Sequence, residues 1–342
     1  MVKVETLPAR TIYLDLNHWY SLGAALAGHP DDPQHVVVLT ELTRRVEAGE
    51  LVFPLSSVHY MELAENPRDH MRDEAASAMA LLSRFTTMAP ISKILDEELA
   101  LELNRRFGRP AFPIKVSKLG KGVGFAFGHS TRLRLKGGTD VGRRKFEARL
   151  GKSIAEWEDE VNAFAEYYLL AGPPKHVWDQ IPNYNPYAAR KVADDQLASF
   201  NVMLNSLRAG GDVASRPLDA ICARQYLFDF FDNFTRAIDS AGFTKHRQPF
   251  HGKQEMADFL MSLPSRRVVS MMQFHYLKDV SRDWKINDLR DIDALSIAIP
   301  YCDIVVADNK ACDTATTRAH LDREFNTVIL SSLTDLGKYL DA

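Results

Sequence analysis

The chain has 342 residues, of which 46% are hydrophobic, and this is enough to build a large buried core in one elaborated domain or two. No stretch approaches the ~18 uninterrupted apolar residues of a membrane-spanning helix, and the N-terminus lacks the apolar core of a secretory signal. We therefore expect a cytoplasmic protein with no membrane partner, and the three cysteines, which lack Cys-x-x-Cys spacing, exclude a zinc finger or a disulfide framework.

The charge is unevenly distributed along the chain. Residues 105–152 contain fourteen Lys or Arg and two acids, a net charge of +12, which leaves −15 for the rest of a chain whose total is −3. Phenylalanines and glycines are interleaved with these cations, as in segments that stack on unpaired bases and approach phosphates. A solvated loop is the alternative to a nucleic-acid contact. The candidate contact residues are Lys115, Lys118, Lys121, Arg132, Arg134, Lys136, Arg143 and Arg144.

Strands and helices alternate in the first 67 residues. TIYLDL (11–16) predicts a buried strand that reaches Asp15, and a helix with apolar residues at helical spacing follows it up to Gly49. ELVFPLSS (50–57) predicts a second strand, and SVHYMELAEN (57–66) a helix that begins at Ser56 or Ser57. This β-α-β-α order is typical of a parallel sheet with crossover helices.

The middle of the chain is mostly helical by its hydrophobic period. The basic, glycine-rich stretch 112–145 has neither a helical period nor strand alternation, and we expect a loop or an irregular hairpin there. The predicted helices span residues 69–86, 92–107, 153–171, 187–209, 217–241 and 253–263.

The α/β pattern resumes near the C-terminus. NDLRDIDALSIAIPYC (287–302) predicts an amphipathic helix, DIVVAD (303–308) a buried strand that ends at Asp308, and NTVILSS (326–332) a last strand before a terminal helix. We expect a discontinuous α/β core formed by residues 1–67 and 286–342, which encloses a mainly helical insertion at 68–285.

Acidic residues follow the strands of this core. Asp15 and Asp308 end two strands, Glu62 lies on the helix after the second strand, and Asp291 or Asp293 begins the next core helix. In an open parallel sheet the carboxyl ends of the strands and the following helix starts share one edge. Carboxylates crowded there repel one another unless a cation neutralises them, and ligation by oxygen alone suits Mg²⁺ or Mn²⁺ rather than zinc.

The order of these features resembles the PIN domain, a family of Mg²⁺- or Mn²⁺-dependent ribonucleases. The matching stretches are YLDLNHW (13–19), LSSVHYMELAE (55–65), LRDIDALSIAIPYCDIVVADN (289–309) and NTVIL (326–330). The resemblance implies a PIN-like three-layer α/β fold and hydrolysis of phosphodiester bonds in RNA, most simply single-stranded, that leaves 5′-phosphate and 3′-hydroxyl ends. It also implies that the catalytic and metal-binding acids are Asp15, Glu62, Asp291 or Asp293, and Asp308.

The helical stripe favours Asp291 for the third position. Residues three, four and seven positions after Asp291 are Ala, Leu and Ala, whereas Asp293 is followed at these positions by Ser, Ile and Pro. Asp293 stays an alternative or supporting ligand. Asn17, Ser57 and Asn309 are candidates for orienting a metal-bound water.

Other functions fit parts of the same pattern. A catalytically silent PIN-like module that binds nucleic acid or protein, or a structure-specific DNA nuclease, would share the fold, and one sequence does not separate RNA from DNA or endo- from exonuclease action. A dehalogenase-like phosphohydrolase is disfavoured because LDLN (14–17) lacks the second aspartate of an Asp-x-Asp loop. The oligomeric state and any protein partner stay open.

Overall fold

A four-stranded parallel sheet lies at the centre of the fold, in the order β2 (Leu51–Val52), β1 (Arg10–Leu14), β5 (Ile304–Val306) and β6 (Val328–Leu330). The computed structural model describes residues 9–108, 115–129, 133–208, 216–243, 250, 252–278 and 284–342. Every pair in the sheet is parallel, with Ile12 opposite Ile304 and Ile304 opposite Val328. The predicted mixed α/β class with a parallel sheet is thereby confirmed.

A short strand from the middle of the chain continues the sheet beyond β2. Leu55 pairs in parallel with Thr87 of β3 (Thr86–Met88): the Leu55 amide donates to the carbonyl of Thr86 at 2.9 Å, and the amide of Met88 donates to the Leu55 carbonyl at 2.7 Å. β3 also pairs in antiparallel fashion with β4 (Leu119–Lys121). An isolated parallel bridge at Leu55, which follows β2, therefore links the two-stranded β3–β4 sheet to the four-stranded sheet.

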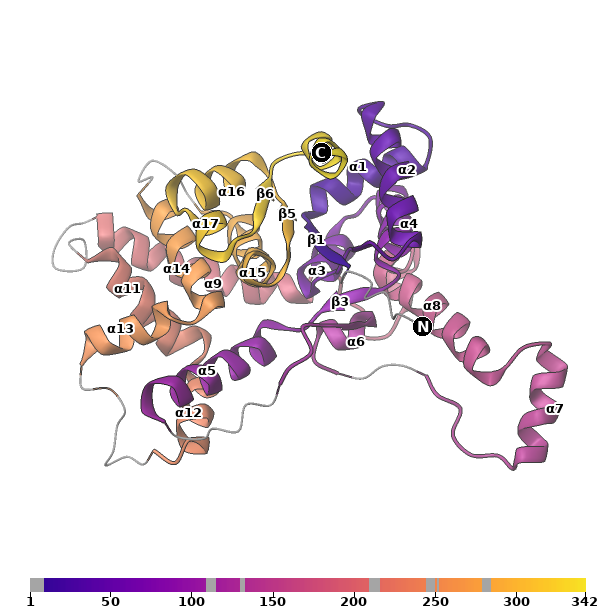
Figure 1. Cartoon of the computed structure of the whole chain (residues 1–342), viewed down its shortest axis with the longest axis horizontal. Helices are drawn as coiled ribbons and strands as arrows, with labels where there is room; N and C mark the ends of the chain where they lie inside the picture. The colour runs from indigo at the N-terminus through magenta and orange to yellow at the C-terminus, as the bar shows by residue number, and fades with distance from the viewer. Residues whose placement is uncertain are drawn as a thin grey trace, which may run out of the picture.

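Both faces of the sheet are buried, because alternate strand residues point to opposite sides. Ile12, Leu14 and Val306 pack with residues of α1, α2, α4 and α18, whereas Tyr13 and Val305 pack with α14 and α15. Figure 1 shows α2 and α4 on one side of β1 and β5, and α14 and α15 on the other. The helices that flank the sheet are α1 (Leu16–Leu26), α2 (Gln34–Glu47), α3 (Ser57–Glu65), α4 (Asp69–Ser83), α14 (Pro264–Leu277), α15 (Ile286–Tyr301), α16 (Asn309–Asp313), α17 (Leu321–Phe325) and α18 (Leu333–Asp341).

The direction of strand addition reverses between β1 and β5. From β1 the chain adds β2 and β3 on one side, and it returns to place β5 and β6 on the other. In open α/β sheets the crevice outside the carboxyl ends of the two strands at such a reversal is the usual ligand site. Here those two strand ends lead into Asp15 and Asp308.

The helical middle of the chain agrees with most predicted ranges, corrects two of them and adds one helix, α14. α5 (Ile91–Phe107), α8 (Ile154–Ala171), α9 (Ala188–Arg208) and α13 (Lys253–Met261) lie where helices were expected. The helix expected at 69–86 ends at Ser83, because Arg84 and Phe85 adopt positive φ angles of 48° and 56°. The helix expected at 217–241 is divided into α11 (Pro217–Arg224), a π-helical turn (Gln225–Asp229) and α12 (Phe231–Ser240). No helix was expected at α14.

The basic stretch is more ordered than expected. Its described parts contain β4, the short helix α6 (Gly122–Ala126) and α7 (Asp140–Leu150), so the expectation of a loop or irregular hairpin over 112–145 was wrong at both β4 and α7. Thr139 caps α7 by accepting a hydrogen bond from the amide of Gly142 at 3.2 Å. In Figure 1, α7 lies at the end of an arm that extends from α8, away from α15 and β5.

Part of the expected insertion is packed into the α/β core. α4 lies against α1, and Ala75 and Met79 of α4 share a cluster with Trp19 and Leu22. A separate apolar cluster forms among α5, α11, α12 and α13. Among the described helices, none has both the length and the apolar character needed to cross a bilayer.

Candidate functional site

A pocket of about 510 Å³ opens at the carboxyl ends of β1 and β5. The backbone amide of Asp15 donates to the carbonyl of Val306 at 2.9 Å, which holds the two strand ends together. α1, α3, α9 and α15 contribute the other walls of the pocket. Six acids line it, together with three cations, and they are Asp15, Glu62, Glu65, Asp288, Asp291, Asp308, Arg190, Lys285 and Arg290.

Asp15 and Asp308 each cap the helix that follows their strand. Oδ1 of Asp15 accepts from the amide of Leu16 at 2.8 Å, and Oδ1 of Asp308 accepts from the amide of Ala311 at 2.6 Å. Helix capping alone explains an aspartate at either position. In the described part of the chain, however, Oδ2 of neither residue accepts a hydrogen bond, so each carboxylate keeps one oxygen for another partner.

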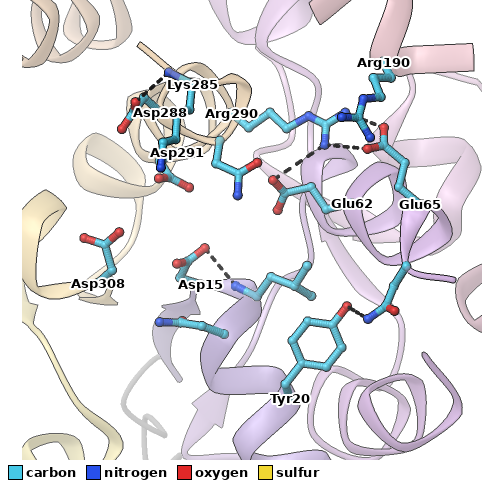
Figure 2. Close-up of a pocket in the computed structure, with 14 residues that line it drawn as sticks. Asp15, Tyr20, Glu62, Glu65, Arg190, Lys285, Asp288, Arg290, Asp291 and Asp308 are labelled. Atoms are coloured by element: carbon cyan, nitrogen blue, oxygen red, sulfur yellow. Dashed lines mark hydrogen bonds and ion pairs between the residues drawn. The ribbon is translucent and has the colours of Figure 1, made fainter. Parts of the chain in front are cut away.

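Glu62 and Asp291 bring two further carboxylates to the same pocket from α3 and α15. Figure 2 shows Asp15, Glu62, Asp291 and Asp308 around a common space, although they come from segments nearly 300 residues apart in sequence. We call these four residues the acid cluster. The carboxylate of Asp291 makes no hydrogen bond or ion pair with any described residue.

The pKa values of the acid cluster show how closely its members interact. Burial raises the pKa of Asp15 to about 6, and repulsion from Asp308 adds to the rise. Burial and repulsion from Asp15 raise the pKa of Glu62 to about 7, although Arg290 opposes the rise. Burial, then repulsion from Asp15, Glu62 and Asp308, raises the pKa of Asp291 to about 9. Asp291, with a pKa of about 9, ionises at neutral pH only when a positive charge joins the acid cluster.

A buried arginine balances part of this charge. Arg290 of α15 donates to both carboxylate oxygens of Glu65, through Nη1 at 3.0 Å and through Nη2, and its Nη1 lies 3.9 Å from Oε1 of Glu62. Its side chain is only 9% exposed. Glu65 therefore neutralises Arg290, and Glu62 interacts with it more weakly and keeps a raised pKa.

Asp288 is an acid of the pocket that the sequence analysis did not assign. Its Oδ1 accepts from Nζ of Lys310 at 2.9 Å, and its Oδ2 accepts from the amide of Lys285 at 2.9 Å. Asp288 thus closes the start of α15 and is engaged by a lysine that follows Asp308. Its position three residues before Asp291, on the same helix face, is the signal that marks it.

Two buried histidines position the strand ends, and the sequence analysis did not assign them either. His59 of α3 is hydrogen-bonded through Nε2 to the carbonyl of Leu14 at 2.8 Å, and His18 of α1 through Nε2 to the carbonyl of Ala307 at 3.3 Å. Leu14 and Ala307 are the residues immediately before Asp15 and Asp308. Burial lowers the pKa of both histidines, that of His59 to about 4. They are neutral near pH 7 and act as hydrogen-bonding groups.

The remaining predicted site residues are distributed around the pocket and beyond it. Asn17 lines the pocket, with its side chain exposed at the start of α1. Asn309 is exposed at the first position of α16 and is not part of the pocket wall. Ser57 and Asp293 line a different cavity, and Asp293 interacts electrostatically with Arg266, Arg224 and Asp229 instead of with the acid cluster.

The predicted nucleic-acid contacts also differ in their surroundings. Lys118 forms an ion pair with Glu97, and Nζ of Lys121 donates to the carbonyl of Arg84 and to the hydroxyl of Thr86, both at 2.9 Å, so these two lysines hold the β3–β4 region together. Arg132 lies outside the described residues. The side chains that are exposed are those of Lys115, Arg134, Lys136, Arg143 and Arg144.

The acid cluster has the donor chemistry of a site for a hard divalent ion, which prefers carboxylate oxygens. Over the described ranges, no three His, Cys, Asp or Glu side chains converge closely enough to hold a metal ion as they stand. Rotation of the side chains that surround the common space would therefore have to accompany ion binding. The free Oδ2 atoms and the raised pKa values fit a site that gains from a cation.

No family model, curated protein or solved structure matches this chain.

Proposed function

We propose that the protein is a Mg²⁺- or Mn²⁺-dependent nuclease that hydrolyses phosphodiester bonds of single-stranded RNA, with a PIN-like core. One observation carries the proposal: four carboxylates from three distant segments line one pocket at the strand reversal, and three of them have raised pKa values. Such clustering is costly unless it serves to bind a cation, which makes a purely structural role a poor explanation. The same observation disfavours a catalytically silent module.

Asp15, Glu62, Asp291 and Asp308 would hold the ion. When bound, a hard divalent ion supplies a nucleophilic water at neutral pH and stabilises negative charge on a phosphoryl oxygen. Asn17 on the pocket wall is placed to accept from or donate to a water beside Asp15. The helix-capping hydrogen bonds hold the Oδ1 atoms of Asp15 and Asp308 and leave the Oδ2 atoms available to the ion.

Positive residues at the pocket rim support a phosphate-bearing substrate. Arg190 of α9 and Lys285 before α15 are exposed and line the same pocket as the acid cluster. They can contact the phosphates on either side of the bond to be cut, because the acids occupy the pocket centre. RNA is proposed over DNA on the PIN resemblance, and a structure-specific DNA nuclease is the second candidate.

A cleavage assay with matched variants tests the proposal. Labelled single-stranded RNA, single-stranded DNA and flap DNA are incubated with the protein and Mn²⁺ or Mg²⁺. We expect cleavage of RNA that falls by about 100-fold or more in Asp15→Asn and in Asp308→Asn, because each change removes one ligand charge. Asp313→Asn is the control, because Asp313 follows Asp308 on the same segment but pairs with Arg318 on the surface. Equal cleavage by the wild type and both pocket variants would refute the catalytic assignment.

A further inference from the structure

A second cavity, of about 300 Å³, lies beside the acid pocket between the same three helices. α3, α9 and α15 line both cavities, with Arg190 of α9 at the acid pocket and Gln196 at the second one. Six helical residues separate these positions, or roughly 9 Å along α9. The second cavity is therefore within reach of a nucleotide whose phosphate sits in the acid pocket.

The second cavity is lined by polar side chains that make few hydrogen bonds, although the guanidinium of Arg266 lies 5.8 Å from the ring centre of Phe230 and interacts electrostatically with Asp293. Arg266 is 5% exposed and Gln273 is 4% exposed, both on α14. Arg266 makes one weak hydrogen bond, from Nε to the hydroxyl of Ser265 at 3.4 Å. Within the described ranges, the Nη atoms of Arg266, the amide of Gln273 and the carboxylate of Asp293 have no hydrogen-bond or ion-pair partner. Buried polar groups are normally satisfied, so the buried side chains of Arg266 and Gln273 favour a ligand, and Asp293 lines the same cavity as an exposed side chain.

Another arginine that lines the cavity does have an acidic partner. Arg224 pairs with Asp229 at 3.1 Å, and its guanidinium lies 3.9 Å from the ring centre of Phe200. Asp229 therefore neutralises Arg224, whereas Arg266 and Asp293 line the same cavity without forming an ion pair. A molecule between them would need to accept hydrogen bonds on one side and donate them on the other.

Apolar side chains form part of the cavity wall. Phe200, Val269 and Ile297 are buried parts of its lining, and Phe228, which also lines it, is 73% exposed. The Phe200 ring stacks on Trp284 at 4.8 Å and is covered by the guanidinium of Arg224, so Phe228 is the lining ring that is free to stack on a planar heteroaromatic ligand. A phosphate alone would not use these walls, and the acid Asp293 would repel it.

We propose that this cavity is a base-binding subsite for guanine, next to the phosphate bound in the acid pocket. This inference rests on the proposed function. Guanine offers O6 and N7 as acceptors to Arg266 and offers N1–H and the N2 amino group as donors to Asp293. Gln273 supplies a further donor and acceptor. Adenine is disfavoured, because its amino group would face the donors of Arg266.

Nucleoside binding to the metal-free protein tests the subsite independently of cleavage. Guanosine, adenosine, cytidine and uridine carry no phosphate and are titrated calorimetrically into the full chain. We expect saturable binding of guanosine at least about tenfold tighter than that of the other three, from one bidentate contact. Arg266→Met should weaken guanosine binding about tenfold or more. Arg267→Met is the control, because the adjacent Arg267 pairs with Glu324 on the surface.

A second variant covers the case in which Arg266→Met fails to fold. Asp293→Asn changes an exposed side chain and replaces one acceptor by a donor, so it should lower the preference for guanosine over adenosine without loss of folding, as judged by circular dichroism. Equal binding of the four nucleosides, or no binding of guanosine, would overturn the subsite. Selective guanosine binding without any RNA cleavage would keep the subsite and refute the nuclease, and cleavage without nucleoside selectivity would do the reverse.

Discussion

His59 donates a hydrogen bond from Nε2 to the carbonyl of Leu14 at 2.8 Å, and its Nδ1 atom accepts a hydrogen bond from the backbone amide of Ser56 at 2.9 Å. Leu14 precedes Asp15, and Ser56 caps the helix that carries Glu62. These partners require the neutral tautomer with the proton on Nε2, in keeping with a pKa lowered to about 4. One imidazole thus sets the position of two members of the acid cluster relative to each other.

Replacing this imidazole should cost stability. His59→Leu leaves the amide of Ser56 and the carbonyl of Leu14 buried without partners, and we expect a loss of about 2–4 kcal/mol in the free energy of unfolding. Chemical denaturation with urea measures it. His70→Leu is the matched control, because His70 is exposed on α4 and should change stability by less than about 0.5 kcal/mol. An unchanged unfolding midpoint in His59→Leu would contradict the positioning role.

The raised pKa of Asp291 predicts that replacing this residue by a neutral one stabilises the fold, and that the stabilisation depends on pH. A carboxyl whose pKa is about 9 in the folded state and near 4 in the unfolded state does not change the free energy of unfolding below pH 4. It lowers that free energy increasingly as the pH rises from 4 toward 9. Asp291→Asn should therefore stabilise the metal-free protein at pH 8 by at least about 1 kcal/mol and should leave it unchanged at pH 4. Thermal unfolding in the presence of a chelator measures both. Stabilisation that is equal at the two pH values would refute the electrostatic explanation.

The Arg290–Glu65 pair predicts strong coupling between two substitutions. Arg290→Met leaves Glu65 as an unpaired, largely buried charge, and we expect a loss of about 3–5 kcal/mol. Adding Glu65→Gln removes that charge and should restore at least about 1 kcal/mol of the loss, a coupling that a double-mutant cycle measures. Additive effects of the two substitutions would show that the pair is not energetically linked.

The exposed cations of α7 predict a salt-dependent contribution to RNA affinity. Arg143→Glu with Arg144→Glu should weaken binding to all single-stranded RNA sequences alike and should reduce the slope of log affinity against log salt by roughly 1.4, or about 0.7 for each lost phosphate contact. Filter binding over a range of salt concentrations measures the slope. Lys253→Glu with Lys338→Glu is the control on other exposed lysines. If both double variants bind alike, the arm is merely solvated.

The local signals in the sequence were sufficient for the core strands and the acids. Buried apolar runs that end on Asp15 and Asp308 predict both strand ends, because burial on two faces and a capping aspartate are short-range properties. The side of α15 that carries Asp291 follows from its helical stripe. All three residues line the pocket that the strand order predicts.

Features that depend on tertiary contacts were missed. The end of α4 depends on positive φ angles at Arg84 and Phe85, and neither residue type indicates such an angle in the sequence. β3 has three residues and gains its place from Leu55, so no run of apolar residues marks it. α14, by contrast, carries Val268, Val269, Met272 and Tyr276 at helical spacing after Pro264, and this signal could have predicted it.

The partners of the acids also could not be predicted from the local sequence. Arg290 and Glu65 are 225 residues apart in sequence, and their pairing depends on α3 and α15 meeting beside the sheet. The two histidines depend on the same packing. Composition showed that a polyanion-binding region was plausible in 105–152, but only the fold shows that Lys118 and Lys121 are engaged within the protein.

Titration of the metal-free protein with Mn²⁺, followed by calorimetry and by electron paramagnetic resonance of the free ion, tests the claim that the acid cluster binds a divalent cation. We predict saturable binding at pH 7.5 that releases protons, because Asp291 and Glu62 must ionise, and that is lost in Asp15→Asn with Asp308→Asn. Asp313→Asn should bind like the wild type. The account would be contradicted if the wild type did not bind Mn²⁺, or if the wild type and the double variant bound it equally.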